Sequence, residues 1–367
     1  MKTFEEIFID RTKYGVKVQA SEYGERGKHI IIDQGQLQVA GYTDREDGLF
    51  EEVPAVIFGD HTRVIKYVDA PFFLGADGVK VLRSKDENAN YKYLYYALKN
   101  VKIPNTGYNR HFKWLKEVQI NYPNRNKQSE IVETLDKVSD IIRKREAELS
   151  AFDDLIKARF VEMFGDMYLN SKEWPEAKLE SMADVVSGIT KGRKTKAEDL
   201  TEVPYMAVSN VKDGYIDWTT VKTIEATQQE IEKYRLLADD VLMTEGGDPD
   251  KVGRGAIIKE PLENCIHQNH IFRVRLDESM MRPEFFAEYL QHQRSKRYFL
   301  GCAKQTTGIA SINMTQLRAL PVLVPPLSRQ EEFVLFKAQV DKSKVAVQKA
   351  LEKTQLLFDS LMQQYFG

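Results

Sequence analysis

Two stretches of this chain decide its fold: YPNRNKQSEIV at residues 122–132 and VPPLSRQEEFV at residues 324–334. A constant offset of 202 residues matches Pro123 with Pro325 and Gln128 with Gln330. The same offset, without a gap, also matches Glu130 with Glu332, Val132 with Val334, Val138 with Val340, Leu149 with Leu351, Leu155 with Leu357, and Phe164-Gly165 with Phe366-Gly367. This period is far longer than that of solenoid repeats, so the sequence predicts a duplicated half-molecule.

Both stretches predict a long helix. Asn126 in the first stretch, and Ser328 with Glu331 in the second, have the residue types and spacing of helix caps. Steps of four and three residues then select mostly apolar side chains, namely Ile131, Leu135, Val138, Ile142, Arg145, Leu149, Phe152, Ile156, Arg159 and Met163, and in the second stretch Phe333, Lys337, Val340, Lys344, Val347, Leu351, Thr354, Phe358, Leu361 and Tyr365. This spacing is typical of a coiled-coil seam.

The expected helices run from Lys127 to Phe164 and from Arg329 to Phe366, each roughly 55 Å long at about 1.5 Å per residue. Neither can bury its apolar stripe alone, so we expect them to pack on each other as an antiparallel coiled coil. The seam side chains expected to hold this pair and its docking surface are Leu135, Val138, Ile142, Leu149, Phe152, Val340, Val347, Leu351 and Phe358. The alternative is two ordinary domain helices, each with its apolar face on its own domain.

Composition sets the class of protein. The 367 residues are too many for one ordinary core, and 42% hydrophobic with 29% charged residues is typical of globular proteins. No apolar run approaches the roughly 18–20 residues that span a bilayer. Two cysteines are too few for a disulfide framework, which favours a reducing cytoplasm. The net charge of −2 leaves room only for local basic patches.

The remainder of the chain predicts two mixed α/β domains, each followed by its helix. The predicted division is residues 1–122, the helix at 123–165, residues 166–324, and the helix at 325–367. Strands are expected at Ala55–Phe58, Arg63–Val68, Gly78–Leu82, Val241–Thr244, Gly255–Lys259 and His270–Val274, and helices at Ala89–Lys99 and Pro283–Tyr298. The expected fold class is therefore α+β, with an internal pseudo-two-fold repeat and two long helices that separate the domains.

Positive charge gathers in two matched zones. The stretch from Asn88 to Lys116 contains no Asp or Glu, and neither does the stretch from Tyr289 to Gln330 at the same place in the repeat. A third basic cluster lies in a glycine-containing turn. Lysine and arginine there can neutralise phosphates, and amide or hydroxyl side chains can reach base edges. The candidate DNA-binding residues are Lys102, Asn109, Arg110, Lys113, Lys191, Arg193, Lys194, Lys196, Arg254, Lys304, Gln305, Thr307 and Ser311.

The competing interpretation makes these zones solvated helix faces with core tyrosines, and for Tyr93 and Tyr96 we favour the core. Matched exclusion of acids in both halves favours nucleic acid for the zones as a whole. No phosphate-binding G-x-x-x-x-G-K-[ST] loop and no strand with GxGxxG occurs. Cys265, His267 and His270 could suggest a metal, but no fourth ligand lies nearby in sequence, so we expect neither a metal site nor catalytic residues.

At this point the residues resemble a known family, the specificity subunits of type I restriction–modification enzymes. TGIASIN at residues 307–313 runs on to LPVLVPPLSRQE at 320–331, which resembles that family's Pro-Pro-Leu-x-x-Gln approach to its conserved helix. VPYMAVSNV at 203–211 and DDVLMT at 239–244 resemble strands of its target recognition domains, as do segments near Gly35, Gly41 and Gly59 in the first half. The first half departs from the pattern, since Asn124-Arg125 replaces Pro-Leu.

The resemblance implies a function without catalysis by this chain. Each recognition domain would bind one half of a bipartite site in double-stranded DNA, and the helix pair would set the spacing. Two methyltransferase subunits would dock on the helical region and bring S-adenosylmethionine. Restriction subunits with motor activity would bring ATP and magnesium. Two alternatives remain open: a coiled-coil scaffold with two protein-binding domains, and a single-chain DNA enzyme with an unrecognised site.

Overall fold

The computed structural model of the chain describes residues 1–75, 77–107, 109–193, 199–248, 251–306 and 309–367. The chain divides into two compact units, the first made of Met1–Glu148 with Val347–Gly367 and the second of Leu149–Ala346. Two long helices, α4 (Arg125–Phe164) and α9 (Leu327–Phe366), each begin in one unit and end in the other. Mixed sheet-and-helix units joined to two long helices confirm the predicted fold class.

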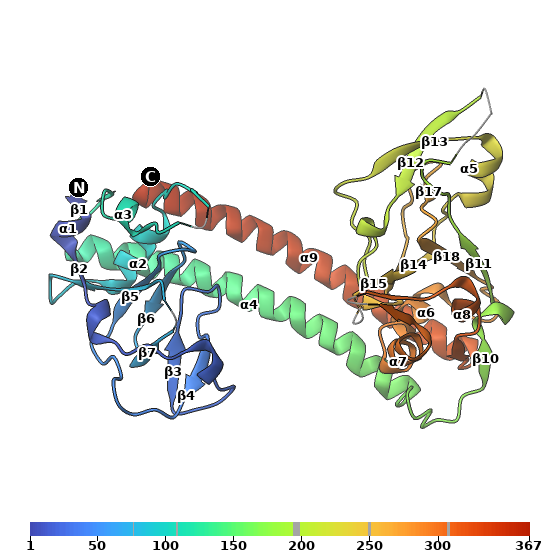
Figure 1. The fold of residues 1–367 in the computed structure, drawn as a ribbon, viewed down its shortest axis with the longest axis horizontal. Helices are drawn as coiled ribbons and strands as arrows, with labels where there is room; N and C mark the ends of the chain where they lie inside the picture. Colours follow the sequence, from blue (N-terminus) through green and yellow to red (C-terminus); the bar gives the residue numbers. More distant parts are fainter. Residues whose placement is uncertain (76, 108, 194–198, 249–250, 307–308) are drawn as a thin grey trace. The chain divides into compact units, whose positions relative to one another are not determined.

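The described residues of the first unit form a four-stranded, a three-stranded and a two-stranded sheet (Figure 1). The four-stranded antiparallel sheet has the order β2-β8-β5-β6, and the three-stranded sheet has the order β4-β3-β7 with β3 parallel to β7. The elements are β1 (Lys2–Thr3), α1 (Phe4–Ile7), β2 (Phe8–Asp10), β3 (His29–Ile32), β4 (Gly41–Thr43), β5 (Ala55–Gly59), β6 (Ile65–Val68), β7 (Phe72–Leu74), β8 (Val79–Ser84), α2 (Tyr91–Lys99), α3 (Phe112–Leu115) and β9 (Gln119–Ile120). β1 pairs with β9 shortly before the start of α4.

The second unit repeats this topology, and its described residues add one further three-stranded sheet, β15-β20-β19. Its four-stranded sheet has the order β11-β18-β14-β16, and its three-stranded sheet has the order β13-β12-β17 with β12 parallel to β17. The elements are β10 (Glu176–Lys178), β11 (Ala183–Ser187), β12 (Thr201–Met206), β13 (Lys222–Ala226), α5 (Gln228–Tyr234), β14 (Val241–Thr244), β15 (Gly246–Gly247), β16 (Gly255–Ile257), β17 (Ile266–His267), β18 (Ile271–Leu276), α6 (Pro283–Tyr289), α7 (Gln293–Cys302), β19 (Lys304–Thr306), β20 (Ile309–Ser311), α8 (Met314–Arg318) and β21 (Pro321–Leu323). Short 3-10 turns complete both units. The internal repeat therefore extends from the helices to the sheets.

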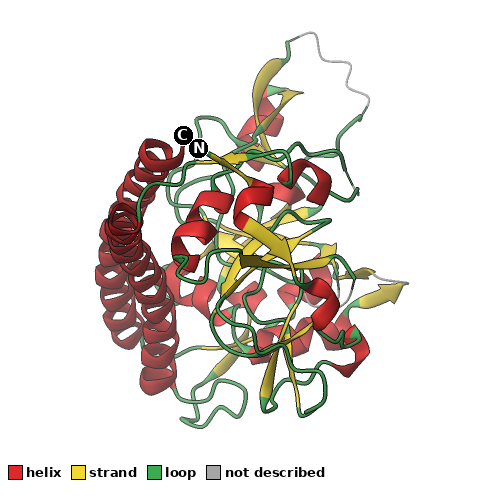
Figure 2. Cartoon of the chain, turned by 90° about the vertical axis from the view of Figure 1, so that its left-hand side faces the viewer, coloured by secondary structure: helices red, strands yellow, loops and turns green. Residues whose placement is uncertain are grey.

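The two long helices pack antiparallel within each unit. In the first unit the start of α4, through Leu135 and Val138, shares a core with Phe358 near the end of α9. In the second unit the end of α4, through Phe160, shares a core with Phe333 near the start of α9. Figures 1 and 2 show the helices side by side, in green and red in the first and both in red in the second. All ten expected seam positions of each helix are buried or half-buried.

At two seam positions that carry a basic residue, a polar contact joins α4 to α9. The Arg145 guanidinium donates a hydrogen bond to the carbonyl of Ala350 in the first unit. In the second unit Lys344 Nζ lies 2.6 Å from Asp153 Oδ1. These contacts satisfy charges at seam positions that a strict apolar heptad would leave to leucine.

Both helices begin two residues before the predicted positions, so the predicted caps are wrong. Asn124, not Asn126, caps α4, because its side-chain oxygen accepts the backbone N–H of Lys127 at 3.0 Å. Ser328 lies inside the first turn of α9, since the carbonyl of Pro326 already accepts the N–H of Gln330 at 3.2 Å. A residue inside the helical turn cannot act as the flanking cap.

The repeated glutamine explains why the two helix starts are alike. Gln128 Nε2 donates to the carbonyl of Pro123 at 2.9 Å, and Gln330 Nε2 donates to the carbonyl of Pro325 at 2.9 Å. Both side chains are buried, so each must find a partner or leave a costly unpaired amide. The same side chain thus fixes the same turn before each helix.

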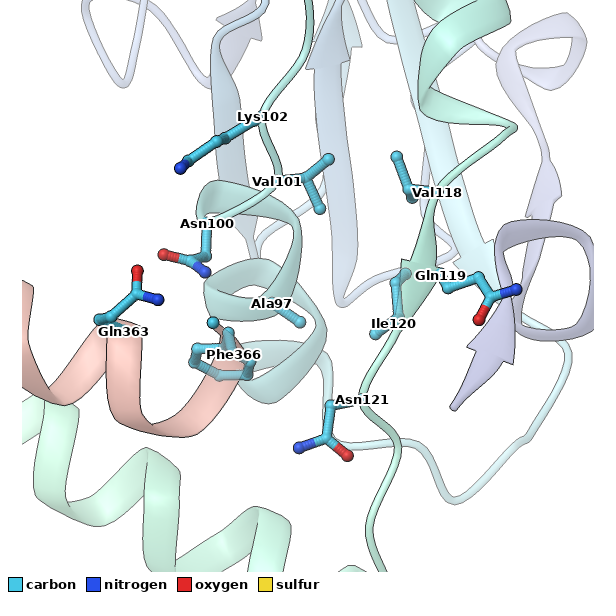
Figure 3. Close-up of a pocket in the computed structure, with 11 residues that line it drawn as sticks. Ala97, Asn100, Val101, Lys102, Val118, Gln119, Ile120, Asn121, Gln363 and Phe366 are labelled. Carbon is cyan, nitrogen blue, oxygen red and sulfur yellow. The ribbon is translucent and has the colours of Figure 1, made fainter.

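The C-terminal end of α9 closes the core of the first unit (Figure 3). The ring of Phe366 lies 5.3 Å from that of Tyr93, and Asn121 Nδ2 donates to the carbonyl of Tyr365 at 3.2 Å. Beside them is a pocket of about 320 Å³ between α2, β9 and the last turn of α9. Tyr93 and Tyr96 are 0% and 5% exposed, which confirms their predicted place in the core, and burial raises the pKa of both phenols.

One predicted helix is interrupted. The sequence predicts a single helix over Pro283–Tyr298, whereas α6 ends at Tyr289 and α7 begins at Gln293. The buried Ser295 hydroxyl donates to the carbonyl of Tyr289, and the ring of His292 stacks on Phe160 at a centroid distance of 4.2 Å. Contacts with α4 therefore override the helical pattern of this segment.

Candidate nucleic-acid interface

Several loops of the first unit meet around the turn that joins β5 to β6. The backbone N–H of Asp60 donates to the carbonyl of Gly78 at 2.7 Å, and the carbonyl of Asp60 accepts the N–H of His111 at 2.8 Å. The Asp60 carboxylate, itself buried, accepts the N–H of Phe112 at 2.7 Å. We call residues 33–38, 60–63, 77–78, 103–107 and 109–112 the first loop cluster.

The predicted residues of the first unit gather in and beside this cluster. Lys102, Asn109, Arg110 and Lys113 are all exposed. Asn109 Nδ2 lies 3.3 Å from Thr106 Oγ1, and Lys113 Nζ lies 4.1 Å from the centroid of the Trp114 ring. The part of the acid-free zone that follows α2 therefore exposes these predicted residues to solvent, whereas α2 itself is largely buried.

Two further basic residues at this end, Lys17 and Lys80, are not among those that the sequence predicts. Lys17 forms an ion pair with Asp77, and hydrogen bonding to Lys17 is the largest cause that lowers the pKa of that carboxyl, with a smaller contribution from Arg110. Lys80 Nζ lies 4.9 Å from the centroid of the Phe112 ring and 3.3 Å from Asp10 Oδ2. Only the fold places these lysines beside the loop of Arg110.

The second unit repeats the backbone of this arrangement. The N–H of Glu245 donates to the carbonyl of His270 at 3.0 Å, and the carbonyl of Glu245 accepts the N–H of Ile312 at 2.8 Å. These bonds correspond to the two Asp60 bonds in the first unit. Asp60 follows β5 and its partner Gly78 precedes β8, just as Glu245 follows β14 and its partner His270 precedes β18. We call residues 245–248, 251–254, 268–270, 304–306 and 309–313 the second loop cluster.

The predicted residues of the second unit lie on and beside a small sheet of this cluster. In the order β15-β20-β19, Ser311 lies opposite both Gly246 and Lys304. Lys304 is exposed, Gln305 belongs to the same strand β19, and Arg254 lies at the base of the β14–β16 loop. Thr307 lies outside the described residues. The fold thus brings together residues that are some 50 positions apart in the sequence.

The third basic cluster divides between solvent and structure. Lys191 is exposed and follows Ile189, which pairs with Gln268 of the second loop cluster. Arg193 instead donates through Nε to Glu230 Oε1 at 2.6 Å, and hydrogen bonding to Arg193 is the largest cause that lowers the pKa of Glu230 to about 2. Lys194 and Lys196 lie outside the described residues.

The histidines near Cys265 have protein partners. His267 is buried, with its ring nitrogens 3.0 Å from the carbonyl of Tyr234 and 3.3 Å from that of Val186. Burial is the main cause that lowers the pKa of His267 to about 4. His270 pairs with Glu245. Within the described ranges, no group of three or more His, Cys, Asp or Glu side chains has an arrangement that could hold a metal.

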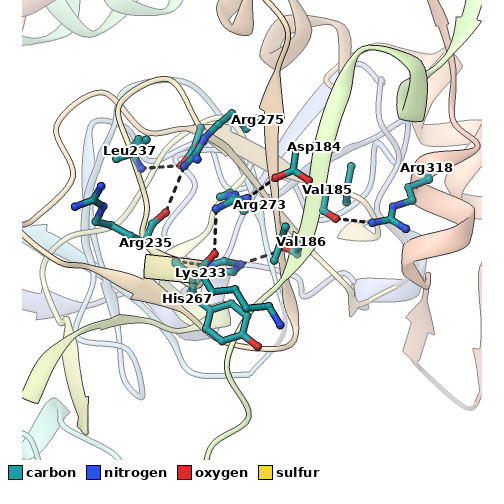
Figure 4. A network of polar contacts seen from close by, with 12 residues as sticks. Asp184, Val185, Val186, Lys233, Arg235, Leu237, His267, Arg273, Arg275 and Arg318 are labelled. Atoms are coloured by element: carbon teal, nitrogen blue, oxygen red, sulfur yellow. Dashed lines mark hydrogen bonds and ion pairs between the residues drawn. The ribbon is translucent and has the colours of Figure 1, made fainter. Parts of the chain in front are cut away.

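A polar network holds β11 and β18 of the second unit in place (Figure 4). Arg273 is 4% exposed and donates to Asp184 at 2.6 Å. Arg275 donates through Nε and Nη2 to the two oxygens of the buried Asp240 at 2.7 and 2.8 Å. Paired, hydrogen-bonded charges of this kind fix the strands that support the second loop cluster.

The outer faces of the helices expose apolar side chains. Leu155 of α4 is 46% exposed and Leu357 of α9 is 51% exposed. These two leucines are a pair of the 202-residue repeat, one in each unit. Among the described helices, none is both long and apolar enough to cross a membrane.

The two polar loop clusters, one in each unit, carry exposed basic residues in or beside them, an arrangement typical of DNA-recognition proteins. The model of the type I restriction modification DNA specificity domain matches residues 15–151 and 171–356. The chain therefore belongs to the family of type I restriction–modification specificity subunits and has two such domains. This confirms the family resemblance seen in the sequence.

Known relatives agree with this assignment. The chain is 23% identical over 348 residues to the specificity subunit of the type I restriction enzyme EcoR124I/EcoR124II from Escherichia coli, covering 88% of this chain and 81% of that protein. It is 25% identical over 196 residues to the putative MjaX specificity subunit from Methanocaldococcus jannaschii, covering 53% of this chain and only 46% of that relative. The crystal structure of a type I restriction-modification S subunit from M. genitalium has a similar fold, with a TM-score of 0.59, 17% identity, and coverage of 100% of this chain and 95% of that chain.

Proposed function

We propose that each unit binds one half of a bipartite DNA site, through its own loop cluster. The observation that supports this most is the recurrence of one backbone frame with different side chains. The backbone hydrogen bonds of Asp60 recur at Glu245. Arg110 of the first cluster, in contrast, lies in a loop before α3, and Lys304 of the second cluster lies on the strand β19. A shared frame holds loops rigidly, and divergent side chains on it would bind different bases. Residues 1–122 and 166–324 are the two proposed recognition domains.

Phosphate contacts in this proposal come from exposed cations in and beside the two loop clusters. Lys102, Arg110, Lys113, Lys191 and Lys304 are exposed, which suits them to neutralise phosphates and fix the position of the DNA. Asn109 and Ser311 carry the polar groups suited to base edges. The chain supplies recognition, and partner subunits would supply the chemistry with S-adenosylmethionine, ATP and magnesium.

The long helices are proposed to set the spacing of the half-sites and to dock methyltransferase subunits. Both helices are unbroken where the chain passes from one unit to the other, at Glu148–Leu149 and Ala346–Val347. The repeated exposed leucines, Leu155 and Leu357, give two equivalent apolar contacts, which suits two copies of one partner. Restriction subunits would join the assembled complex.

Docking is tested by replacing these leucines. Leu155→Glu and Leu357→Glu should each weaken co-purification with the methyltransferase subunit, and the double variant should abolish binding of both copies. Leu262→Glu, a 44% exposed leucine outside the helices, is the matched control. Full binding by the double variant would exclude this docking surface.

Recognition is tested by mapping methylated adenines. The chain is co-expressed with the methyltransferase subunit encoded beside it, and genomic DNA is examined by single-molecule sequencing with and without the chain. The proposal predicts a bipartite methylated motif that depends on this chain. A methyltransferase that binds S-adenosylmethionine but methylates nothing more when the chain is present would favour the scaffold alternative.

A further inference from the structure

One loop of the first loop cluster has an exposed apolar side chain between two exposed amides at its tip. The consecutive residues Gln36, Leu37 and Gln38, between β3 and β4, are all exposed or half-exposed, and Leu37 is 72% exposed. In the part of the chain that the structure describes, the Gln36 amide makes no hydrogen bond. A bare leucine between two amides at a loop tip offers an apolar contact beside hydrogen-bonding groups, a combination that a base edge can match.

The tip is held from below by a buried lysine. Lys66 is 2% exposed, and its Nζ donates to the carbonyl of Leu37 at 2.6 Å and lies 3.3 Å from Asp33 Oδ1. Asp33 Oδ1 also accepts the N–H of Gly35 at 2.8 Å. Since a buried ammonium is unfavourable without partners, these bonds hold the loop in one conformation.

Gln34 ties the same loop to the rest of the first loop cluster. Its Nε2 donates to the carbonyl of Asp77 at 2.9 Å, and its Oε1 accepts the N–H of His61 at 3.1 Å. Its carbonyl accepts the Thr62 hydroxyl at 2.6 Å. Arg110 acts electrostatically on Asp77, so the tip belongs to the same end of the unit as the basic loop.

A cavity of about 470 Å³ lies beside the tip. Gln36 and Gln38 line one part of it, and Arg63, Lys66 and Lys99 supply positive charge. Among the described residues that line it, none is acidic. Arg63 has a φ of +63°, and its Nη1 donates to the carbonyl of Ile103 at 3.3 Å, which directs this cation along the loop that leads to Arg110.

We propose that Gln36 and Leu37 determine specificity for an A·T base pair in the first half-site, a contact that rests on the proposed function. The Gln36 amide is suited to the N6 and N7 atoms of adenine, and the Leu37 side chain to the methyl group of thymine. Arg63 and Lys99 bind the adjacent phosphates. Gln38 positions the tip, because its Nε2 donates to the carbonyl of Tyr67 at 2.7 Å.

The experiment uses the full chain assembled with its methyltransferase subunit, and a library of randomised duplex DNA. Methylated motifs are sequenced for the wild type, Gln36→Ala, Leu37→Ala and the control Gln119→Ala, an exposed glutamine of β9 in the same unit. Gln36→Ala and Leu37→Ala should each lower the preference for A·T at one position of the first half-site by about 5- to 150-fold. The second half-site and the control should keep the wild-type preference.

Base analogues separate the two contacts. Uracil in place of thymine at the mapped position should weaken methylation by the wild type and leave Leu37→Ala unaffected, because both changes remove the same methyl contact. In the same way, 7-deazaadenine should affect the wild type and not Gln36→Ala.

The outcomes distinguish this inference from the proposed function. Wild-type protein without any bipartite motif would overturn the proposed function and the inference with it. A wild-type motif that both variants retain, with unchanged preference at every base pair, would overturn the inference alone. So would loss of methyltransferase binding by folded variants, which would make the tip a protein contact.

Discussion

At the start of the long helices, the two repeats use the same side chain for the same bond, from Gln128 to Pro123 and from Gln330 to Pro325. At the loop clusters only the backbone bonds recur. Asp60 is buried and accepts a backbone N–H of α3, whereas Glu245 pairs with the exposed His270. We therefore expect stability and assembly to depend on what the repeats share, and propose that DNA specificity depends on what they do not.

The helices should therefore govern stability most strongly. Leu135 is fully buried in the core of the first unit, so Leu135→Ala should lower the free energy of unfolding by about 2–5 kcal/mol. Leu357→Ala, at a 51% exposed position of the other helix, should change it by less than about 0.5 kcal/mol. Urea unfolding measures both. Equal decreases would contradict the seam assigned to these helices.

Of the two glutamines that the repeats share, Gln330 should contribute more to the free energy of unfolding than Gln128. Gln330 also accepts the N–H of Arg282 at 2.8 Å and donates to the carbonyl of Met280 at 3.2 Å. Gln330→Ala leaves more buried groups unpaired than Gln128→Ala, so we expect the free energy of unfolding to fall by about 3 and about 1 kcal/mol respectively. Thermal unfolding measures both. A larger decrease for Gln128→Ala would contradict the greater role assigned to the hydrogen bonds of Gln330.

The loops should govern DNA affinity with little effect on stability. The double variant Arg110→Ala with Lys113→Ala, and the double variant Lys191→Ala with Lys304→Ala, should each reduce the salt dependence of DNA binding. The slope of log affinity against log salt should become shallower by roughly 2, at about 0.9 for each phosphate that is no longer neutralised. Melting temperatures should stay near the wild-type value. Fluorescence anisotropy on the assembled complex tests this, and an unchanged slope would remove these residues from the interface.

The smallest expected effect is confined to the second unit and depends on pH. The pKa of Glu230, ordinarily 4.5, is lowered to about 2, first by its hydrogen bond with Arg193. The stabilisation is therefore complete above pH 4.5 and disappears as the pH falls toward 2. Glu230→Gln should cost about 1 kcal/mol at pH 6 and less at pH 3, as measured by urea unfolding. A cost that grows on acidification would contradict this pairing.

Much of the fold could be predicted from the sequence because its signals are local or repeated. The 202-residue repeat and the heptad spacing locate both helices, and short strand-like runs locate several of the strands. The predicted helix starts are wrong because the Asn124 side chain makes the capping bond expected of Asn126, and because the carbonyl of Pro326 already accepts the first helical N–H groups, ahead of Ser328. The break after Tyr289 cannot be read from the local pattern, since it depends on the ring of Phe160 in α4, more than 100 positions away in sequence.

The candidate site was predicted only in part, for a similar reason. Acid-free zones show where cations are concentrated, and Arg110 and Lys304 are exposed in loop clusters. Sequence alone does not show that Glu230 binds Arg193 or that Lys66 holds the carbonyl of Leu37, because both depend on segments that meet only in the folded chain. The loop of Gln36, Leu37 and Gln38 carries no charge, so the charge pattern did not mark it as a candidate contact with DNA.

The central claim, that each unit determines one half-site, is tested most directly by exchanging one domain. Residues 1–122 are replaced by the corresponding domain of a relative with a known half-site, and methylated adenines are mapped for the assembled complex. The account predicts that one half-site changes to that of the donor, while the other half-site persists. A change in both half-sites, or no change in either with a folded and assembled protein, would contradict it.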